Sequence, residues 1–332
     1  MIYLSKFATY LPSNIVTSDD IDRLLATHSP EFEYRPGLIE RVSGIKTRRW
    51  AGPEEHSSTL AIQAARTLFD SLPKNLQIDT LIYAAATKDV GEPATAHIVN
   101  DGLKLADVRS VFDVQNACNS FLDGIEIAVS LIEARRAQQV LVVSGEKPSV
   151  LCKTRVRTRE EFKQVFAGYT FGDAGAAVLV STEKRLGQYE YLGSGNQVES
   201  SHWTAGMVRG GGTRFRGREE DNYFQGGGAE IAKVFTSFAP EAVDRILEEK
   251  KWSLFAFDTI CLHQVSLAYT REFMRCLGIP PKKCRLTIEE YGNVASGSIP
   301  LGLRVIPEAG QQVLLVGLAG GSALRLTGLK VL

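Results

Sequence analysis

The chain has 332 residues, and its 38 basic and 38 acidic side chains leave a formal net charge of zero. This balance gives no electrostatic case for nucleic acid as the main partner. The five cysteines are an odd number without paired C-x-x-C spacing, which argues against a disulfide framework and against a zinc site.

The N-terminal segment, Met1 to Phe7, lacks a charged leader followed by an apolar core, and no run of about 18 apolar residues occurs in the chain. We therefore expect neither export nor a membrane span. Reduced thiols in the cytoplasm fit this sequence best.

Four apolar segments form two similar pairs. Residues 78–85 resemble residues 257–264, and residues 137–144 resemble residues 310–317, at offsets of 179 and 173 positions. Matches in the same order at nearly the same offset predict a duplicated unit. Continuous apolar strands separated by helical segments are typical of an α/β fold whose sheets are covered on both faces.

The duplication divides the chain into a first half of residues 1–182, a connecting segment of 183–230 and a second half of 231–332. The connecting segment is polar, with glycine-rich runs at 209–216 and 225–228. Neither run has the G-x-x-x-x-G-K-[ST] pattern, and neither opens a helix after a clear strand. We therefore expect a surface excursion here and not a nucleotide site.

Cys118 lies between a predicted strand and a predicted helix. The strand, Ser110–Val114, is rich in β-formers, and apolar residues recur at helical spacing after the cysteine, namely Leu122, Ile125, Val129 and Ile132. A thiol at the start of a buried helix meets unpaired N–H groups and the positive end of the helix dipole, which lower its pKa. The alternative is a small buried apolar side chain. The position favours a nucleophile.

Two polar residues of the second half also lie at turns between predicted elements. His263 ends the buried strand predicted to begin at Thr259, and Asn293 follows Gly292 at a turn into another helix. Each alone is more often structural, as a satisfied histidine or a turn asparagine. Together with Cys118 they are far more specific, because duplicated halves related by a pseudo-dyad bring equivalent strand ends into one cleft.

These segments, together with Phe171-Gly-Asp-Ala-Gly-Ala-Ala-Val178, resemble the thiolase-fold condensing enzymes and specifically their β-ketoacyl-ACP synthase III branch. The resemblance runs essentially from end to end. It implies a thiolase-like α/β fold of duplicated halves in five layers, α-β-α-β-α, and a homodimer. It also implies no cofactor and no metal, since thioesters of CoA or phosphopantetheine are the substrates.

The resemblance implies a role for each matching residue. Cys118 accepts the acyl group, and the backbone N–H groups of Cys118 and Gly321 form the oxyanion hole. His263 and Asn293 stabilise the enolate of a second thioester, whose carbon attacks the Cys118 thioester. The implied reaction is a Claisen condensation of acyl thioesters that gives a β-ketoacyl product.

The chain departs from the usual synthase III pattern beside Pro93. Glu92 stands where ordinary members commonly place an apolar gate residue from the partner subunit. A carboxylate there is similar to the branch that joins two acyl thioesters head to head without decarboxylation, as in olefin and pyrone biosynthesis, where a glutamate from the neighbouring subunit serves as base. Val265 and Ser266 also look closer to that branch. The alternative is a surface-loop glutamate.

Other departures concern the entry of the substrate. Leu38 occupies a position where an aromatic residue often stacks on adenine, and Arg41 is displaced. Arg271, Lys282 and Lys283 are candidates to receive the phosphate or the acidic helix of an acyl-carrier protein, although exposed basic residues are usually only solvated. The sequence leaves the donor open between acyl-CoA and an acyl-carrier thioester.

Alternative functions remain. A decarboxylative 3-oxoacyl-ACP synthase III would use a malonyl thioester as extender, and an acyltransferase would pass the acyl group from Cys118 to an amine or alcohol. Papain-like proteases share the Cys-His-Asn order, but their Cys-Gly-Ser-Cys-Trp signature is missing. A non-catalytic partner subunit would not need Cys118, His263 and Asn293 intact.

Overall fold

The computed structural model describes residues 1–215 and 217–332. The strands in chain order are β1 (Tyr3–Leu4), β2 (Ala8–Tyr10), β3 (Ile15–Thr17), β4 (Thr47–Arg49), β5 (Thr80–Ala84), β6 (Ser110–Val114), β7 (Gln139–Glu146), β8 (Ala174–Ser181), β9 (Tyr189–Val198), β10 (Gly206–Val208), β11 (Phe224–Gly226), β12 (Thr259–Leu262), β13 (Gln312–Ala319) and β14 (Ala323–Val331). The α-helices are α1 (Ser18–His28), α2 (Leu38–Ser43), α3 (Ser57–Phe69), α4 (Thr95–Leu103), α5 (Ser120–Glu133), α6 (Arg159–Val165), α7 (Gly228–Lys250), α8 (Leu267–Cys276), α9 (Ile288–Tyr291) and α10 (Ser298–Gly302).

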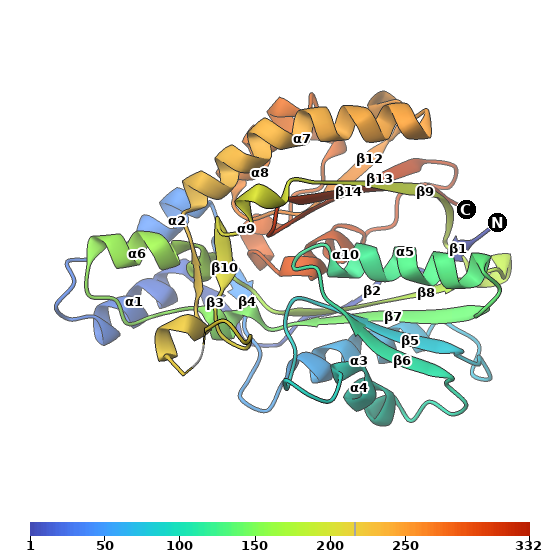
Figure 1. Cartoon of the computed structure of the whole chain (residues 1–332), viewed down its shortest axis with the longest axis horizontal. Coiled ribbons are helices and arrows are strands. Elements are labelled where there is room, and N and C mark those ends of the chain that lie inside the picture. The colour runs from blue at the N-terminus through green and yellow to red at the C-terminus, as the bar shows by residue number, and fades with distance from the viewer. Residues whose placement is uncertain (216) are drawn as a thin grey trace.

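A mixed sheet of ten strands organises the chain. Its order is β12-β13-β14-β9-β1-β8-β7-β5-β6, with β2 beside β8. The short strand β1 pairs antiparallel with both β8 and β9 and so joins two blocks of strands. Figure 1 shows the two blocks one above the other, with α5 and α10 between them.

Alternate side chains of the central strands face different helical layers, as the two-residue period of a strand requires. In β5, Ile82 joins the core around α5, whereas Leu81 packs in the core of α3 and α4. In β13, Leu315 faces the core around α5, whereas Leu314 packs with α7 and α8. The layers are therefore helix, strand block, helix, strand block and helix, which confirms the predicted five-layer arrangement.

The two blocks repeat one pattern of pairing. In the first block β5 runs parallel to β7, and β7 runs antiparallel to β8. In the second, β12 runs parallel to β13, and β13 runs antiparallel to β14. The strand pairs recognised as similar in sequence, β5 with β12 and β7 with β13, therefore occupy equivalent places. The predicted duplication is confirmed.

The connecting segment 183–230 differs from the predicted surface excursion. Its residues Tyr189–Val198 form β9, which pairs with β14 along its length and belongs to the second block. Small residues hide this strand in the sequence: a Cβ on Gly195 would lie 2.6 Å from a side-chain carbon of Ile246, so glycine lets α7 pack closely. Of the glycine-rich run 209–216, residue 216 lies outside the described residues.

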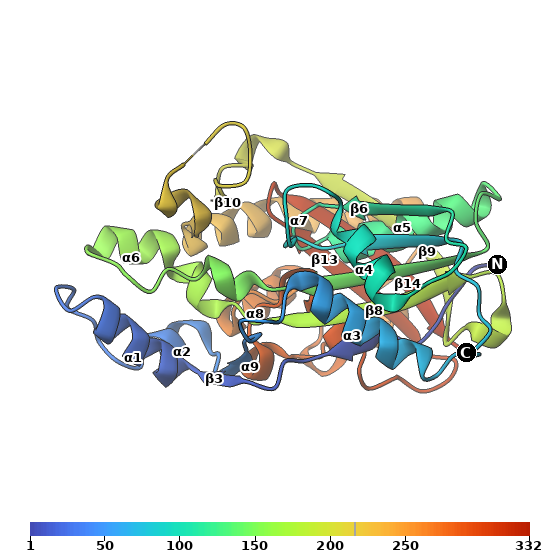
Figure 2. The same ribbon diagram turned by 90° about the horizontal axis from the view of Figure 1, so that it is seen from below.

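Strands β10 and β11 of the connecting segment pair antiparallel and lie beside α6, at the end of the molecule that also holds α1 and α2 (Figure 2). Within the described part of the chain, no helix combines the length and apolar character needed to cross a membrane.

Candidate active site

Three of the site residues predicted from sequence follow the carboxyl ends of parallel strands. Strand β5 runs parallel to both β6 and β7, and β12 runs parallel to β13. Cys118 follows β6, His263 follows β12 and Gly321 follows β13. Ligands of open α/β sheets bind outside such strand ends. The strand ends of the two blocks meet at one shared cavity.

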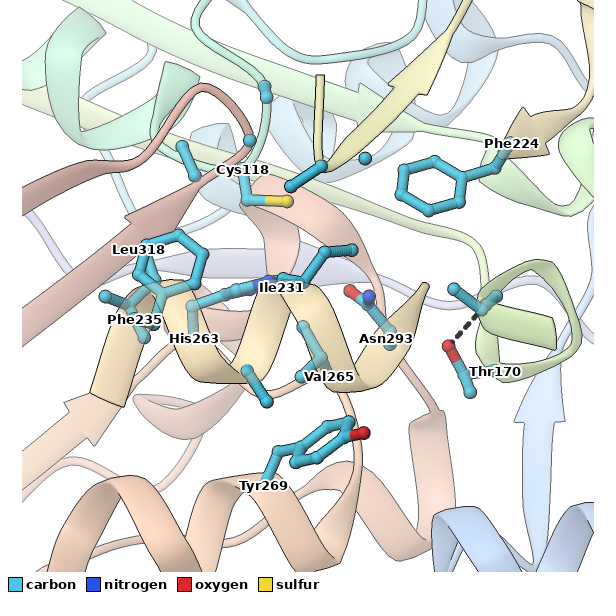
Figure 3. A pocket seen from close by; sticks show the side chains of 18 of the residues that line it. Cys118, Thr170, Phe224, Ile231, Phe235, His263, Val265, Tyr269, Asn293 and Leu318 are labelled. Carbon is cyan, nitrogen blue, oxygen red and sulfur yellow. Dashed lines mark hydrogen bonds between the residues drawn. The ribbon is translucent and has the colours of Figure 1, made fainter. Parts of the chain in front are cut away.

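That cavity has a volume of about 670 Å³, which lies in the range usual for small-molecule sites. Cys118, His263, Asn293 and Gly321 all line it. In Figure 3 the side chain of Cys118 lies across the cavity from those of His263 and Asn293. Most other lining side chains are apolar, including Phe166, Met207, Phe224, Ile231, Phe235 and Leu318. Such a wall excludes water and suits a hydrocarbon chain.

A tight turn places Cys118. Ala117 has a φ of 46°, in the left-handed region. The hydroxyl of Ser120 accepts from the N–H of Asn116 at 2.8 Å and donates to the carbonyl of Ala117 at 2.6 Å. Helix α5 begins at Ser120 with Asn119 as its N-cap, so Cys118 precedes the cap by one residue and does not itself cap the helix.

The expectation of a lowered thiol pKa is wrong for the free protein. Burial raises the pKa of Cys118 to about 12, and the negative charge of Glu146 adds to the effect, while a backbone hydrogen bond opposes it. Desolvation of the thiolate therefore outweighs the favourable field at the helix start. Cys118 is held as a thiol.

His263 and Asn293 are both buried, with exposed fractions of 4% and 6%. The backbone N–H of Asn293 donates to the carbonyl of Thr170 at 2.8 Å, and its side-chain oxygen accepts from the N–H of Ala295 at 3.0 Å. The amide oxygen is thereby occupied, and the amide nitrogen is left as the group that can donate to a ligand. Burial lowers the pKa of His263 to about 4, so its imidazole is neutral at pH 7 and offers a neutral N–H.

The other predicted site residues do not line the cavity. Glu92 is exposed in the loop between β5 and α4. On α2, Leu38 packs into a neighbouring core and Arg41 is exposed, whereas Val42 lines the cavity. Arg271 is exposed on α8. The roles predicted for these residues depend on a second subunit or on a bound thioester, and they stay predictions.

The sequence analysis missed Glu146 and Thr87. Thr87 lines the cavity, and Glu146 lies fully buried at the end of β7. A sequence signal existed: a charged residue ends the apolar run that begins at Val140, in the place where a parallel strand meets the site. The polar end of that strand resembles the end of β12 at His263.

Similar proteins are known over most of the chain. Residues 112–195 match the family described as 3-oxoacyl-[acyl-carrier-protein (ACP)] synthase III, and residues 247–329 match its C-terminal part. Beta-ketoacyl-[acyl-carrier-protein] synthase III of Clostridium perfringens is 30% identical over 325 residues, which cover 95% of this chain and 94% of the relative. The acyl-CoA:acyl-CoA alkyltransferase of Xanthomonas campestris pv. campestris is 28% identical over 320 residues, which cover 92% and 91%.

Solved structures agree with these matches. Cerulenin-bound OleA of Xanthomonas campestris has a TM-score of 0.88 at 24% identity, covering 99% of this chain and 98% of that chain. A variant of the same OleA with bound lauric acid and lauroyl-CoA gives the same TM-score, identity and coverage. At this level of identity the likeness establishes the fold, which is thiolase-like as predicted.

Proposed function

The chain belongs to the 3-oxoacyl-[acyl-carrier-protein] synthase III family, and from that premise we propose that it joins two acyl thioesters head to head without decarboxylation. It is a ketosynthase-type acyltransferase that performs Claisen chemistry. The observation that carries the proposal is the apolar cavity shared by Cys118, His263, Asn293 and Gly321. The likeness to an acyl-CoA:acyl-CoA alkyltransferase supports the head-to-head form.

The first half-reaction is a thioester exchange at Cys118. Its sulfur attacks the carbonyl carbon of an acyl thioester of CoA or phosphopantetheine, and the thiol proton leaves with the departing thiol. The oxyanion of the tetrahedral intermediate accepts from the N–H groups of Cys118 and Gly321. Gly321 has a φ of +85° and no atom within 4 Å of its absent Cβ, so a thioester can approach the backbone there.

The second half-reaction forms a carbon–carbon bond. A base removes the α-proton of the second thioester, and the enolate oxygen accepts hydrogen bonds from His263 and Asn293. The enolate carbon attacks the acyl carbon on Cys118, and the cysteine sulfur leaves as thiolate and recovers a proton. The product is a β-ketoacyl thioester, and both neutral donors act where charge develops.

Glu92 is the proposed base, supplied by the partner subunit of a homodimer. Its exposure in one chain agrees with a role in another chain's cleft. Strand β6, which leads to Cys118, is the edge strand of the sheet, and four of its five residues are only half-buried. An isologous contact at this edge would continue the sheet across the dyad and bring the two loops near the two clefts.

Leu38, Arg41 and Arg271 are proposed to contact the donor at the cavity mouth, because Val42 and Glu272, their neighbours on α2 and α8, line the cavity. The donor is acyl-CoA or an acyl-carrier protein. We keep the cytoplasm as the proposed compartment, since Cys118, Cys152, Cys261, Cys276 and Cys284 are all free.

A decarboxylative synthase is the second candidate, favoured by the 30% identity to a Clostridium perfringens synthase III. In that reaction a malonyl thioester loses CO₂ to give the enolate, and no base at Glu92 is needed. Transfer of the acyl group from Cys118 to an amine or alcohol is a further outcome of the same acyl-cysteine.

The test incubates the purified protein with acyl-CoA and acyl-carrier thioesters, with and without a malonyl thioester. Intact mass reports acylation, and product analysis reports condensation. We expect one acyl group on the wild type and none on Cys118→Ala. The control is Cys276→Ala, which removes a thiol at the far end of α8 and is expected to carry one acyl group. We also expect a β-ketoacyl product from simple acyl thioesters alone. A product that forms only with malonyl donor supports the second candidate, and labelling of Cys118→Ala contradicts both.

A further inference from the structure

Glu146 is a fully buried carboxylate beneath the cavity, with an exposed fraction of 0%. Its Oε1 accepts from the N–H of Ala86 at 2.8 Å and from the hydroxyl of Ser296 at 2.5 Å. Its Oε2 accepts from the N–H and the hydroxyl of Thr87 at 3.1 and 3.0 Å. Among residues 1–215 and 217–332, no ion pair includes Glu146. Burying an unpaired carboxylate is costly even when donors satisfy it, so a merely space-filling role is not a sufficient explanation.

The donors to Glu146 come from both halves of the chain. Ala86 and Thr87 line the cavity and begin the loop after β5 that carries Glu92. Ser296 lies three residues after Asn293, and its own N–H is 3.3 Å from Oε1 of Glu146. Ala295 lies between Asn293 and Ser296 in the chain, and its N–H donates a hydrogen bond to the side-chain oxygen of Asn293. The Glu146 carboxylate is thus hydrogen-bonded to one segment at the cavity from each half of the chain.

We propose that Glu146 is a positioning residue for carbon–carbon bond formation: it ties the start of the Glu92 loop to the turn that holds Asn293. This inference rests on the proposed function and deepens it. Two segments that are about 200 positions apart in sequence have to keep their functional groups aligned with one enolate. Small displacements of such groups lower the reaction rate strongly. Glu146 itself does not line the cavity and does not touch the reacting atoms.

The charge of Glu146 separates this role from a purely structural one. Its negative charge adds to the burial that raises the pKa of the Cys118 thiol. Loss of the charge is therefore expected to make Cys118 more reactive as a free thiol. Loss of the alignment is expected to slow condensation. A simple loss of stability would also expose the thiol and speed its alkylation, but it would lower acylation and condensation together. An undiminished rate of Cys118 acylation beside slower condensation therefore separates the positioning role from a loss of stability.

Glu146→Gln is the decisive variant, because its amide NH₂ faces N–H and O–H donors where the carboxylate accepted. We expect alkylation of Cys118 by iodoacetamide at pH 8 to become faster than in the wild type. We expect kcat for condensation to fall about 10²-fold, with the rate of Cys118 acylation by an acyl-CoA not reduced. Intact mass spectrometry after a short pulse measures alkylation and acylation of Cys118 in parallel samples, and product analysis measures condensation.

Two matched variants complete the design. Ser296→Ala keeps the carboxylate and removes the shorter of its two bonds to the Asn293 turn, the one from the Ser296 hydroxyl, so condensation is expected to slow while the alkylation rate stays that of the wild type. Asp79→Asn removes a carboxylate whose Oδ2 accepts from the N–H groups of Gln138 and Gln139 at the opposite end of β7. This control is expected to lower stability and to leave both half-reactions unchanged.

Unchanged condensation in Glu146→Gln overturns the inference, and so does a parallel loss of acylation and condensation that tracks the loss of stability. Failure of the wild type to become acylated would instead overturn the proposed function. The two failures are therefore distinguishable.

Discussion

His263 and Asn293, the proposed donors to the enolate, both line the apolar cavity. The neutrality of His263 follows from burial, which lowers its pKa to about 4. A neutral N–H does not need a carboxylate partner in the free protein. Its hydrogen bond is therefore available to the enolate oxygen when negative charge develops in the transition state.

The first prediction concerns this pair. His263→Ala and Asn293→Ala are each expected to lower the condensation rate about 10²–10³-fold, the usual effect of removing one such donor. Acylation of Cys118 is expected to stay largely intact, because neither side chain belongs to the first oxyanion hole. Rapid quenching and intact mass separate the two steps, and loss of acylation before condensation would show that the division of roles is wrong.

The second prediction concerns stability and pH. Burial lowers the pKa of His263 to about 4 in the folded chain, against about 6.5 for a solvated imidazole. Between these values the unfolded chain binds more protons, so the free energy of unfolding falls as pH is lowered from about 6.5 to about 4. The shift corresponds to about 3 kcal/mol, to order of magnitude.

The matched variant His263→Asn is expected to lack this part of the loss. Denaturant unfolding at pH 7, 6, 5 and 4 measures it as the difference between wild type and variant. The difference is needed because other groups titrate in the same range: burial raises the pKa of Asp173 to about 6, which acts in the opposite direction. Equal pH dependence of the two proteins would contradict a neutral, buried imidazole.

At the scale of the elements, the contact of helix α3 with the sheet depends on two glycines. Gly145 of β7 and Gly175 of β8 are paired neighbours in register. A Cβ on Gly145 would lie 1.7 Å from the carbonyl oxygen of Ser57, and one on Gly175 would lie 2.0 Å from that of Leu60. The helix backbone thus rests directly on the strands, at the strand ends that lead to the site.

The third prediction follows from these distances. Gly145→Ala and Gly175→Ala are each expected to lower the free energy of unfolding by at least about 1–3 kcal/mol, because the helix has to move off the sheet. Gly212→Ala, in the connecting segment where nothing lies within 4 Å of the added carbon, is the control and is expected to stay within about 0.5 kcal/mol of the wild type. Denaturant titration decides, and equal values for the three variants would contradict the close packing.

At the scale of the whole molecule, the edge strand β6 and the exposed Glu92 both point to a second copy of the chain. One protomer holds Cys118, His263 and Asn293 in its own cavity, whereas Glu92 does not line that cavity. A complete set of proposed groups therefore requires two subunits. Sedimentation is expected to show a dimer at micromolar concentration, and a monomer would count against any cross-subunit base.

The fourth prediction tests that composite site. Glu92→Ala is expected to spare acylation of Cys118 and to stop condensation of simple acyl thioesters, while Glu92→Asp, one methylene shorter, is expected to retain part of the rate. Co-expressed Cys118→Ala and Glu92→Ala chains are expected to recover about a quarter of wild-type activity, since half of the dimers are mixed and each mixed dimer has one complete cleft. Absence of rescue, or full activity of Glu92→Ala, would return Glu92 to a surface-loop role.

The sequence by itself determined the strands around Cys118 and His263, the helix after Cys118 and the duplication. These features are local: β6 has the bounds predicted for its strand, and Leu122, Ile125, Val129 and Ile132 are all buried on α5. The period of apolar residues reports the burial of one face whatever the distant partners are. The strand-end position of His263 could be read for the same reason, whereas Asn293 follows the short helix α9 and not a strand.

Only the tertiary structure decided the electrostatics of the site and the place of β9. The pKa of Cys118 depends on desolvation by the segments around it and on Glu146, a residue 28 positions away, and neither is visible in the turn that surrounds the cysteine. The strand β9 carries glycines because helix α7 packs against it, so its apolar signal is weak. Burial and charge at a point sum over every segment that folds around it, whereas sequence patterns record only the preferences of one segment at a time.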